Sequence, residues 1–222
     1  MKYSFKKVKK KFVFYELGNE VLTHNDNILF VPTEKLAYIT QQELNNLKNN
    51  KIKKFSITSI VFFACNLNLQ ERKLIINSIL SSLTFDNVLY RSMEDNFFSL
   101  KMNNLYNKYI NDFSKTFDVK LETLYQINLS QKKLNIQKLN SYLTHLDNFK
   151  LTLLFKLVNI SKSVILSYNF IIKSFGIKKF FNLSNFENIY QKEKWGTVGE
   201  QFNVEENISD ELKKIQTFFK NL

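Results

Sequence analysis

The sequence has few of the residues that punctuate β-rich folds. Its 222 residues include only 4 Gly and 1 Pro, whereas sandwiches and barrels of many short strands need tight turns throughout. Glycine-rich phosphate loops are disfavoured too, because Gly196 and Gly199 lack both a third glycine and a preceding strand. These shortages exclude an all-β protein and predict that helices dominate.

Cysteine and histidine are nearly absent as well. Cys65 is the only cysteine, which excludes an intrachain disulfide and a disulfide-stabilised secreted domain and is typical of a reducing compartment. His24 and His145 have no second ligand at metal-binding spacing. No serine stands in a nucleophile elbow, and adjacent acidic residues such as Glu205-Glu206 diverge on a helix. We therefore expect no catalytic residue, no metal and no cofactor, and predict that the protein is not an enzyme.

Arginine is the third scarce residue, although the chain is strongly basic. Lys and Arg total 32 against 20 Asp and Glu, a formal net charge of +12, yet only Arg72 and Arg91 are arginine. Base readout and bidentate phosphate contacts favour the planar guanidinium group, so we expect no nucleic-acid partner. The basic run Lys6–Lys11 is typical of a solvated hairpin rim. A basic helical nucleic-acid-binding protein that uses this run is the alternative function.

No apolar stretch is long and uncharged enough to span a membrane. The most apolar segment, Leu151–Ile172, contains Lys156 and Lys162, whereas a span needs about 20 predominantly apolar residues. Residues 1–12 contain no apolar leader. We expect no membrane insertion and interpret residues 151–172 as part of a buried helix. With 44% hydrophobic residues and 22 Phe, the chain has the apolar content of a folded domain.

Strand signals concentrate in residues 3–31. Phe12–Tyr15 is aromatic and β-branched, Gly18-Asn19 offers a hairpin turn, and Ile28–Val31 follows a polar turn. Pro32 stops the sheet, and Thr33 is an N-cap candidate for a helix through about Leu47. The sequence thus predicts an α+β fold: a small N-terminal antiparallel β domain, residues 1–32, followed by a larger α-helical domain, residues 33–222.

Beyond residue 47, helical periodicity continues after a polar, basic loop over residues 45–54. Residues 55–67 fit a helix or a strand equally well, and further apolar periods predict the remaining helices. These helices cover residues 69–83, 93–117, 130–146, from 147 or 148 to a glycine stop at Gly176, 183–194, and from Ser209 onward. The expected apolar faces include Phe97, Leu100, Tyr109, Ile110, Phe113 and Phe117 in the second of them and Leu212, Ile215, Phe219 and Leu222 in the last.

The segment Gln191–Gly196 holds the only tryptophan beside a glycine. On a helix, Gln191 and Trp195 share one face at i and i+4, and Glu193 lies well round from both. We expect Gln191 and Trp195 to point into the fold, with the tryptophan anchoring the helix end, and Glu193 to point away. Glu193 is then either a solvated helix-end acid or a contact for a partner.

At this segment the sequence resembles the ATP synthase assembly chaperones of the Atp12 type, which hold the alpha subunit of the F1 catalytic head. The family has a Gln-x-Glu-x-Trp-Gly motif, here Gln191, Glu193, Trp195 and Gly196. Other blocks of the family stand in the same order along this chain. They are Leu17–Glu20, Leu29–Thr33, Asp86 with Tyr90-Arg91, and Ile160–Ser163.

The resemblance implies an ATP-independent chaperone that binds the unassembled alpha subunit and promotes assembly of the catalytic head. It also implies a helix over residues 55–67, a location in the bacterial cytoplasm or the mitochondrial matrix, and a protein that we expect to be monomeric. The implied partner-binding residues are Gln191, Glu193, Trp195, Tyr90, Arg91 and Asp86. The last three are expected at the rim or in its support, with Asp86 and Arg91 forming an ion pair.

Overall fold

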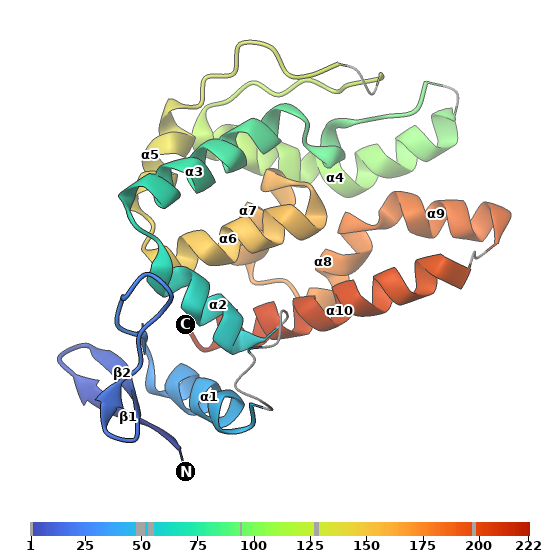
Figure 1. The fold of residues 1–222 in the computed structure, drawn as a ribbon. Coiled ribbons are helices and arrows are strands. Elements are labelled where there is room, and N and C mark those ends of the chain that lie inside the picture. The colour runs from blue at the N-terminus through green and yellow to red at the C-terminus, as the bar shows by residue number, and fades with distance from the viewer. Residues whose placement is uncertain (1, 48–51, 53–55, 94, 127–128, 197–198) are drawn as a thin grey trace. The chain divides into compact units, whose positions relative to one another are not determined.

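The computed structural model describes residues 2–47, 52, 56–93, 95–126, 129–196 and 199–222, and of residues 199–206 only the backbone. A small antiparallel sheet comes first (Figure 1), made of β1 (Tyr3–Val8), β2 (Lys11–Glu16), β3 (Asn19–Glu20) and β4 (Phe30–Val31). β2 pairs with each of the other three strands. Helices follow along the rest of the chain, which confirms the predicted α+β fold.

The order of the helices along the chain is close to the predicted one. They are α1 (Glu34–Asn45), α2 (Ile57–Asn66), α3 (Leu69–Thr84), the 3-10 helix η2 (Asn87–Leu89), α4 (Asn96–Phe117), α5 (Gln137–His145), α6 (Asn148–Ser161), α7 (Val164–Lys173), α8 (Ile177–Ser184), α9 (Phe186–Trp195) and α10 (Gly199–Lys220). The chain forms two compact units: residues 1–72, 147–153 and 200–222 in the first, and residues 73–146 and 154–199 in the second. The predicted domain boundary at residue 32 remains a prediction.

The first unit packs the sheet against α1 and α2. Thr33 caps α1, with its hydroxyl accepting the Leu36 N–H at 3.3 Å as predicted. The ambiguous segment from residue 56 to residue 66 forms α2, which begins with a reciprocal Ser56–Ser59 capping box. Residues 53–55, and most of the predicted basic loop, lie outside the described part. Cys65 is buried on α2, and its thiol donates to the Phe30 carbonyl at 3.3 Å.

The basic run lies at the rim of the β1–β2 hairpin. Its lysines are exposed, and the Lys11 ammonium lies 3.8 Å from the centre of the Phe30 ring. Lys6 lies over Tyr15 in the same way, at 5.3 Å. Such cation–π contacts let lysine chains cover aromatic rings while their charges stay in water.

The second unit has an aromatic core between α4, α7 and α8. Tyr109, Phe113, Phe170 and Phe180 are among its fully buried side chains. Two side chains link its helices through buried polar bonds: the Tyr106 hydroxyl donates to the Leu183 carbonyl at 2.7 Å, and the Asn169 amide donates to the Tyr109 carbonyl at 3.2 Å. Because buried polar groups need partners, these two bonds favour the packing of α4 against α8 and α7.

The single long helix predicted from residue 148 to residue 175 is wrong. The helix ends at Ser161, Lys162 adopts a left-handed φ of 52°, and α7 begins at Val164. The Ser161 hydroxyl donates to the Leu157 carbonyl, and the Ser163 hydroxyl caps α7 by accepting the Leu166 N–H at 3.0 Å. Hydroxyls that satisfy backbone groups locally make a break favourable within an apolar run.

Three other predicted helix boundaries are wrong as well. α5 starts at Gln137 rather than about residue 130, because Gln131 holds its own segment in a loop by bonding both the N–H and the carbonyl of Glu122. Gly176 does not end a helix but precedes α8, which was not predicted, and the helix predicted over residues 183–194 is α9, which begins at Phe186. α10 begins at Gly199, ten residues before Ser209, and its buried residues include Phe218 rather than Phe219.

Candidate functional site

Helix α9, which carries the tryptophan motif, is held to α4 by one face. Phe186 and Tyr190 stack against Phe98, with ring centres 5.7 Å and 4.5 Å apart. The Tyr190 hydroxyl and the Lys194 ammonium both donate to Asp95 Oδ2, at 3.1 Å and 2.7 Å. Residues 186, 190 and 194 recur every four positions and therefore form one stripe along the helix. This stripe, not the tryptophan, anchors α9.

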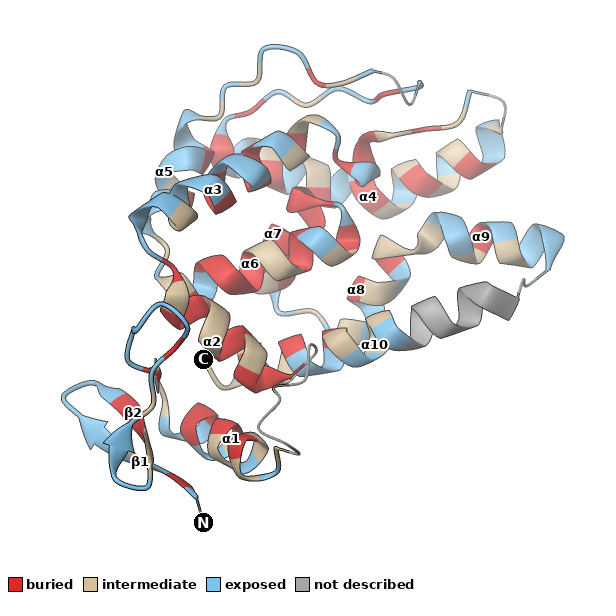
Figure 2. Cartoon of the chain, in the orientation of Figure 1, coloured by how far each residue is buried: buried red, intermediate tan, exposed pale blue. Residues whose placement is uncertain are grey.

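The predicted inward orientation of Gln191 and Trp195 is wrong. Trp195 is 76% exposed and Gln191 is exposed as well, and Figure 2 shows α9 mostly in the colour of exposed residues. Each lies one position beyond a member of the anchored stripe, which rotates it by about 100° around the helix. The Gln191 amide donates to the Glu187 carboxylate at 3.3 Å. The motif thus presents its tryptophan to solvent.

Glu193 is exposed, as predicted. Within the described part of the chain its carboxylate has no hydrogen-bond or ion-pair partner. Gly196 ends the helix in a left-handed conformation with φ 83°, and its N–H bonds the Lys192 carbonyl. The glycine stop predicted from the sequence is therefore confirmed, and it leaves Glu193 on the last turn of α9.

The block Asp86–Arg91 forms a buried turn around η2. Asp86 is fully buried; its two carboxylate oxygens accept the N–H groups of Val88 at 3.2 Å and Ile165 at 3.1 Å. Burial raises the pKa of the Asp86 carboxyl to about 6, and hydrogen bonds from Ser163 and the backbone oppose that rise. The expected ion pair between Asp86 and Arg91 is wrong, because backbone donors already satisfy the carboxylate.

Arg91 is also buried, with 5% of its surface exposed. Its Nε donates to the Asn103 side-chain oxygen, and its Nη1 donates to the carbonyls of Val88 and Tyr90, all at 2.7 Å. Its Nη2 is buried without a hydrogen-bond partner. Desolvation lowers the pKa of the guanidinium. Tyr90 next to it is half-buried and donates to the Leu129 carbonyl at 3.0 Å.

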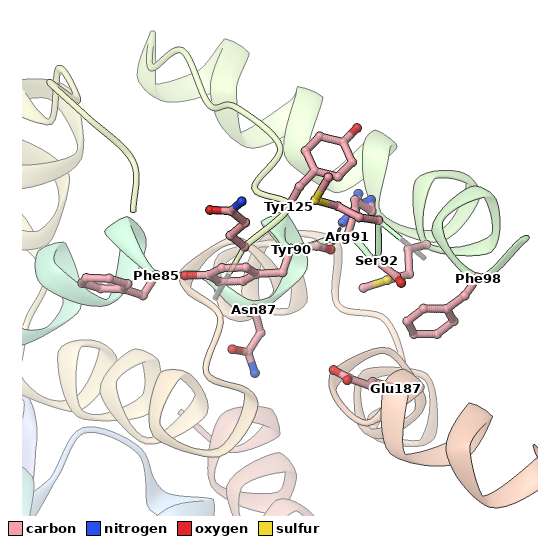
Figure 3. Close-up of a pocket in the computed structure, with 11 residues that line it drawn as sticks. Phe85, Asn87, Tyr90, Arg91, Ser92, Phe98, Tyr125 and Glu187 are labelled. Atoms are coloured by element: carbon pink, nitrogen blue, oxygen red, sulfur yellow. Dashed lines mark hydrogen bonds between the residues drawn. The ribbon is translucent and has the colours of Figure 1, made fainter. Parts of the chain in front are cut away.

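Two hollows in the second unit bring these segments together. A cavity of about 660 Å³ is lined by Tyr90, Arg91 and Glu187 among others (Figure 3), and a second, of about 590 Å³, is lined by Glu187, Gln191 and Trp195. Ser92, Phe98 and Glu187 line both. The structure thus places Tyr90, Arg91, Gln191 and Trp195 around adjoining hollows. Asp86 and Glu193 line neither: Asp86 lies beneath the surface and Glu193 lies elsewhere on α9.

Large exposed apolar side chains line the hollows or, in the case of Phe97, flank a lining residue on α4, and all of them except Trp195 were missed as site residues. They are Phe85, Met93, Phe97, Leu100, Tyr125 and Trp195, each more than half exposed, and we call them the apolar rim. Met93 and Tyr125 line both the Arg91 cavity and a third hollow, which Leu100 also lines. On α4 the buried residues include Phe98 and Met102, so Phe97 and Leu100 form a second stripe beside the core stripe. The signal in the sequence that could have revealed these residues is the presence of two apolar stripes on one helix.

Among the described residues, no helix combines the length and the apolar character that a membrane span requires. The same residues also hold no group of three or more His, Cys, Asp or Glu placed to bind a metal ion.

Part of the sequence matches the model of a known protein family. Residues 17–118 match the model of the ATP12 chaperone protein family. This segment of the chain resembles the ATP12 chaperone family. The matched segment includes Asp86, Tyr90 and Arg91, and the tryptophan motif lies beyond it. No curated protein matches the sequence.

Solved structures show that the ATP12-type fold extends over the whole chain. Atp12 from Paracoccus denitrificans is 17% identical, with a TM-score of 0.84 over 99% of this chain and 95% of that one. A substitution variant of the same protein is 18% identical, with a TM-score of 0.85 and the same coverage. A candidate chaperone from Agrobacterium tumefaciens is 14% identical, with a TM-score of 0.84 over 99% of this chain and 83% of that one. At these identities the likeness establishes the fold.

Proposed function

We propose that this chain, which resembles the ATP12 chaperones in part of its sequence and in its fold, binds the unassembled alpha subunit of the ATP synthase catalytic head and keeps it competent for assembly. It acts without ATP, as a monomer, in the compartment where the head assembles: the bacterial cytoplasm or the mitochondrial matrix. Release follows when the beta subunit takes its place on the alpha subunit. Holding of this kind needs a matching surface rather than a reactive group.

The observation that carries the proposal is the apolar rim. Phe85, Phe97 and Leu100 are 56%, 63% and 60% exposed, although side chains of this size are normally buried in a monomeric protein. Phe85 and Leu100 line hollows, and Phe97 lies beside Leu100 on α4, so these side chains are not scattered singly. Exposed apolar patches of this kind mark sites of protein interaction. An unassembled subunit exposes the apolar surface that its neighbours later cover, so the two surfaces suit each other.

The motif residues have distinct proposed roles at this surface. Trp195 and Tyr90 supply aromatic contact area with a polar end, as is common at protein interfaces. Gln191 and Arg91 offer hydrogen bonds beside them. Glu193, exposed and without an internal partner, makes a charged contact at the edge. Asp86 acts from below by holding the turn that positions Tyr90 and Arg91.

The test is protection of isolated alpha subunit from aggregation. Glu193→Lys reverses a charge at an exposed position, so we expect an unchanged melting curve and weaker protection than the wild type provides. Glu20→Lys is the matched control. Glu20 is an exposed residue of β3, and this substitution makes the same charge change in the first unit. Equal protection by wild type and Glu193→Lys would remove Glu193 from the interface. No enrichment of alpha subunit in a pull-down from native lysate would overturn the proposed function.

Salt dependence separates this function from nucleic-acid binding. Affinity for nucleic acid falls steeply and linearly on a log–log plot as salt rises, because bound cations release counterions from phosphate. An apolar interface changes little over the same range. We expect alpha-subunit holding to persist as salt increases. A steep loss, together with retention of DNA or RNA at low salt, would favour a role for the Lys6–Lys11 rim instead.

A further inference from the structure

Arg91 has two N–H donors that none of the described residues accepts. A guanidinium has five N–H groups, and three of them are taken by Asn103, Val88 and Tyr90. The remaining two belong to Nη2, which has no hydrogen-bond partner in the described residues. Leaving charged donors unpaired in a buried position is costly. Because the fold leaves these two donors unpaired, they can bind an anion.

The surroundings of Arg91 set the chemistry of that anion. The guanidinium lies 5.8 Å from the Tyr106 ring, and no carboxylate of the described residues forms an ion pair with it. It lines the 660 Å³ cavity together with Phe85, Met93 and Tyr125 of the apolar rim. Its partner Asn103 lines the adjoining hollow with Leu100. A charged donor pair beside a cavity with apolar edges fits an anion carried on an apolar group.

We propose that Arg91 receives an Asp or Glu carboxylate of the client protein, while an apolar side chain next to that carboxylate packs on Phe85, Met93 and Tyr125. This inference rests on the proposed holding function and names the chemical group on the client that the chaperone recognises. A guanidinium edge accepts a carboxylate with directional, charge-assisted bonds, which gives specificity to an otherwise apolar contact. The recognised segment is therefore a carboxylate beside a large apolar residue.

Access to Nη2 requires side chains of the cavity wall to move. Met93 is 65% exposed and Met102 also lines the cavity. Methionine is unbranched and changes rotamer easily, so it adapts to different partners. Glu187 is the one carboxylate among the lining residues described, and it stands on the opposite helix, α9 (Figure 3). Its negative charge should repel an incoming carboxylate.

The experiment uses small probes, so that it does not depend on the alpha subunit. Binding of 3-phenylpropionate, its neutral amide and inorganic phosphate is measured by ligand-observed NMR on the full chain. The variants are Arg91→Lys, which keeps the charge but removes the planar fork, and Glu187→Gln, which removes the repelling charge from an exposed position. Glu122→Gln is the matched control, since Glu122 is exposed and lines none of these hollows.

We expect 3-phenylpropionate to bind more tightly than the amide or phosphate. Arg91→Lys should weaken it by about tenfold or more, a factor that corresponds to 1.4 kcal/mol. Glu187→Gln should strengthen it by about two- to fivefold, in line with the strength of exposed charge pairs. Glu122→Gln should leave it unchanged. Because Arg91→Lys is a buried change that can disturb folding, an unchanged or weaker affinity in Glu187→Gln overturns the proposal by itself, as does tighter binding of phosphate or of the amide.

The two proposals fail in different ways. If 3-phenylpropionate binds as expected but alpha subunit is neither captured nor protected, the carboxylate site stands and the client assignment falls. If alpha subunit is protected equally by wild type and Glu187→Gln, and the probe does not bind, the holding function stands and the role of Arg91 falls.

Discussion

Lys194 Nζ lies 2.7 Å from Asp95 Oδ2, an ion pair that joins the last turn of α9 to the first turn of α4. The other oxygen of Asp95 caps α4 by accepting the Phe98 N–H at 2.8 Å. One carboxylate thus starts the helix that carries Phe97 and Leu100 and holds the helix that carries Trp195. The position of the tryptophan within the apolar rim depends on this residue.

Acid should loosen α9. The hydrogen bond from Lys194, with help from the Phe98 N–H, lowers the pKa of Asp95 from 3.8 to about 2. A lowered folded-state pKa means that this stabilisation is complete above a pH of about 4 and is lost as the pH falls towards about 2. We expect the fluorescence anisotropy of Trp195 to drop over that window in wild type and to be low and constant in Asp95→Asn. Identical acid profiles for the two proteins would contradict the prediction.

Trp195 should report client binding directly. It is the only tryptophan and is 76% exposed, so iodide should quench its emission readily in the free protein. On addition of alpha subunit the emission should shift to shorter wavelength and lose its sensitivity to iodide, because burial removes water from the ring. An emission spectrum that does not change while alpha subunit is held would place Trp195 outside the interface.

Trp195→Ala and Tyr190→Ala should behave in opposite ways, although both shorten an aromatic side chain of α9. Trp195 is exposed, so its loss should change the free energy of unfolding by less than about 0.5 kcal/mol and weaken protection of alpha subunit. Tyr190 is 7% exposed, so its loss should cost about 3 kcal/mol. Denaturant titrations measure both values. A large loss of stability in Trp195→Ala would mean that the tryptophan is structural after all.

The pH dependence of stability should reveal the buried Asp86. Burial raises its folded-state pKa from 3.8 to about 6, so the folded protein binds this proton more tightly than the unfolded chain. The resulting stabilisation is present at low pH and disappears as the pH rises from about 4 to about 6. The free energy of unfolding of wild type relative to Asp86→Asn should therefore fall by up to about 3 kcal/mol over that range. A difference that stays constant or grows with pH would show that the hydrogen bonds to the carboxylate outweigh its burial.

Cys65 should resist thiol reagents in the folded protein. Burial raises the pKa of its thiol from 9.0 to about 11, and only the thiolate reacts. That two-unit difference alone lowers the reactive fraction by about a hundredfold at neutral pH, and the 7% exposure of Cys65 slows the reaction further. Labelling as fast as in denaturant would show that α2 opens readily from the sheet.

Local chemistry in the sequence determined the sheet, the start of α1 at Thr33 and the end of α9 at Gly196. Each depends on residues within a few positions: aromatic and β-branched alternation, a side-chain oxygen for an N-cap, and a glycine that accepts a positive φ. The motif blocks, read in order, also gave the resemblance to the assembly chaperones. Scarce Gly, Cys, His and Arg were sufficient to argue against most other classes of function.

Only the tertiary structure decided which way those elements face. Phe97 and Phe98 are equally apolar in the sequence, yet Phe98 stacks on Tyr190 and Phe97 is 63% exposed, because α9 covers just one of the two stripes on α4. Trp195 turned outward for the same reason: Phe186, Tyr190 and Lys194 take the contacts with α4. The open donors of Arg91 follow from which carbonyls the turn at η2 brings near it. Burial and hydrogen-bond partners are set by neighbours distant in sequence, and periodicity alone carries no information about them.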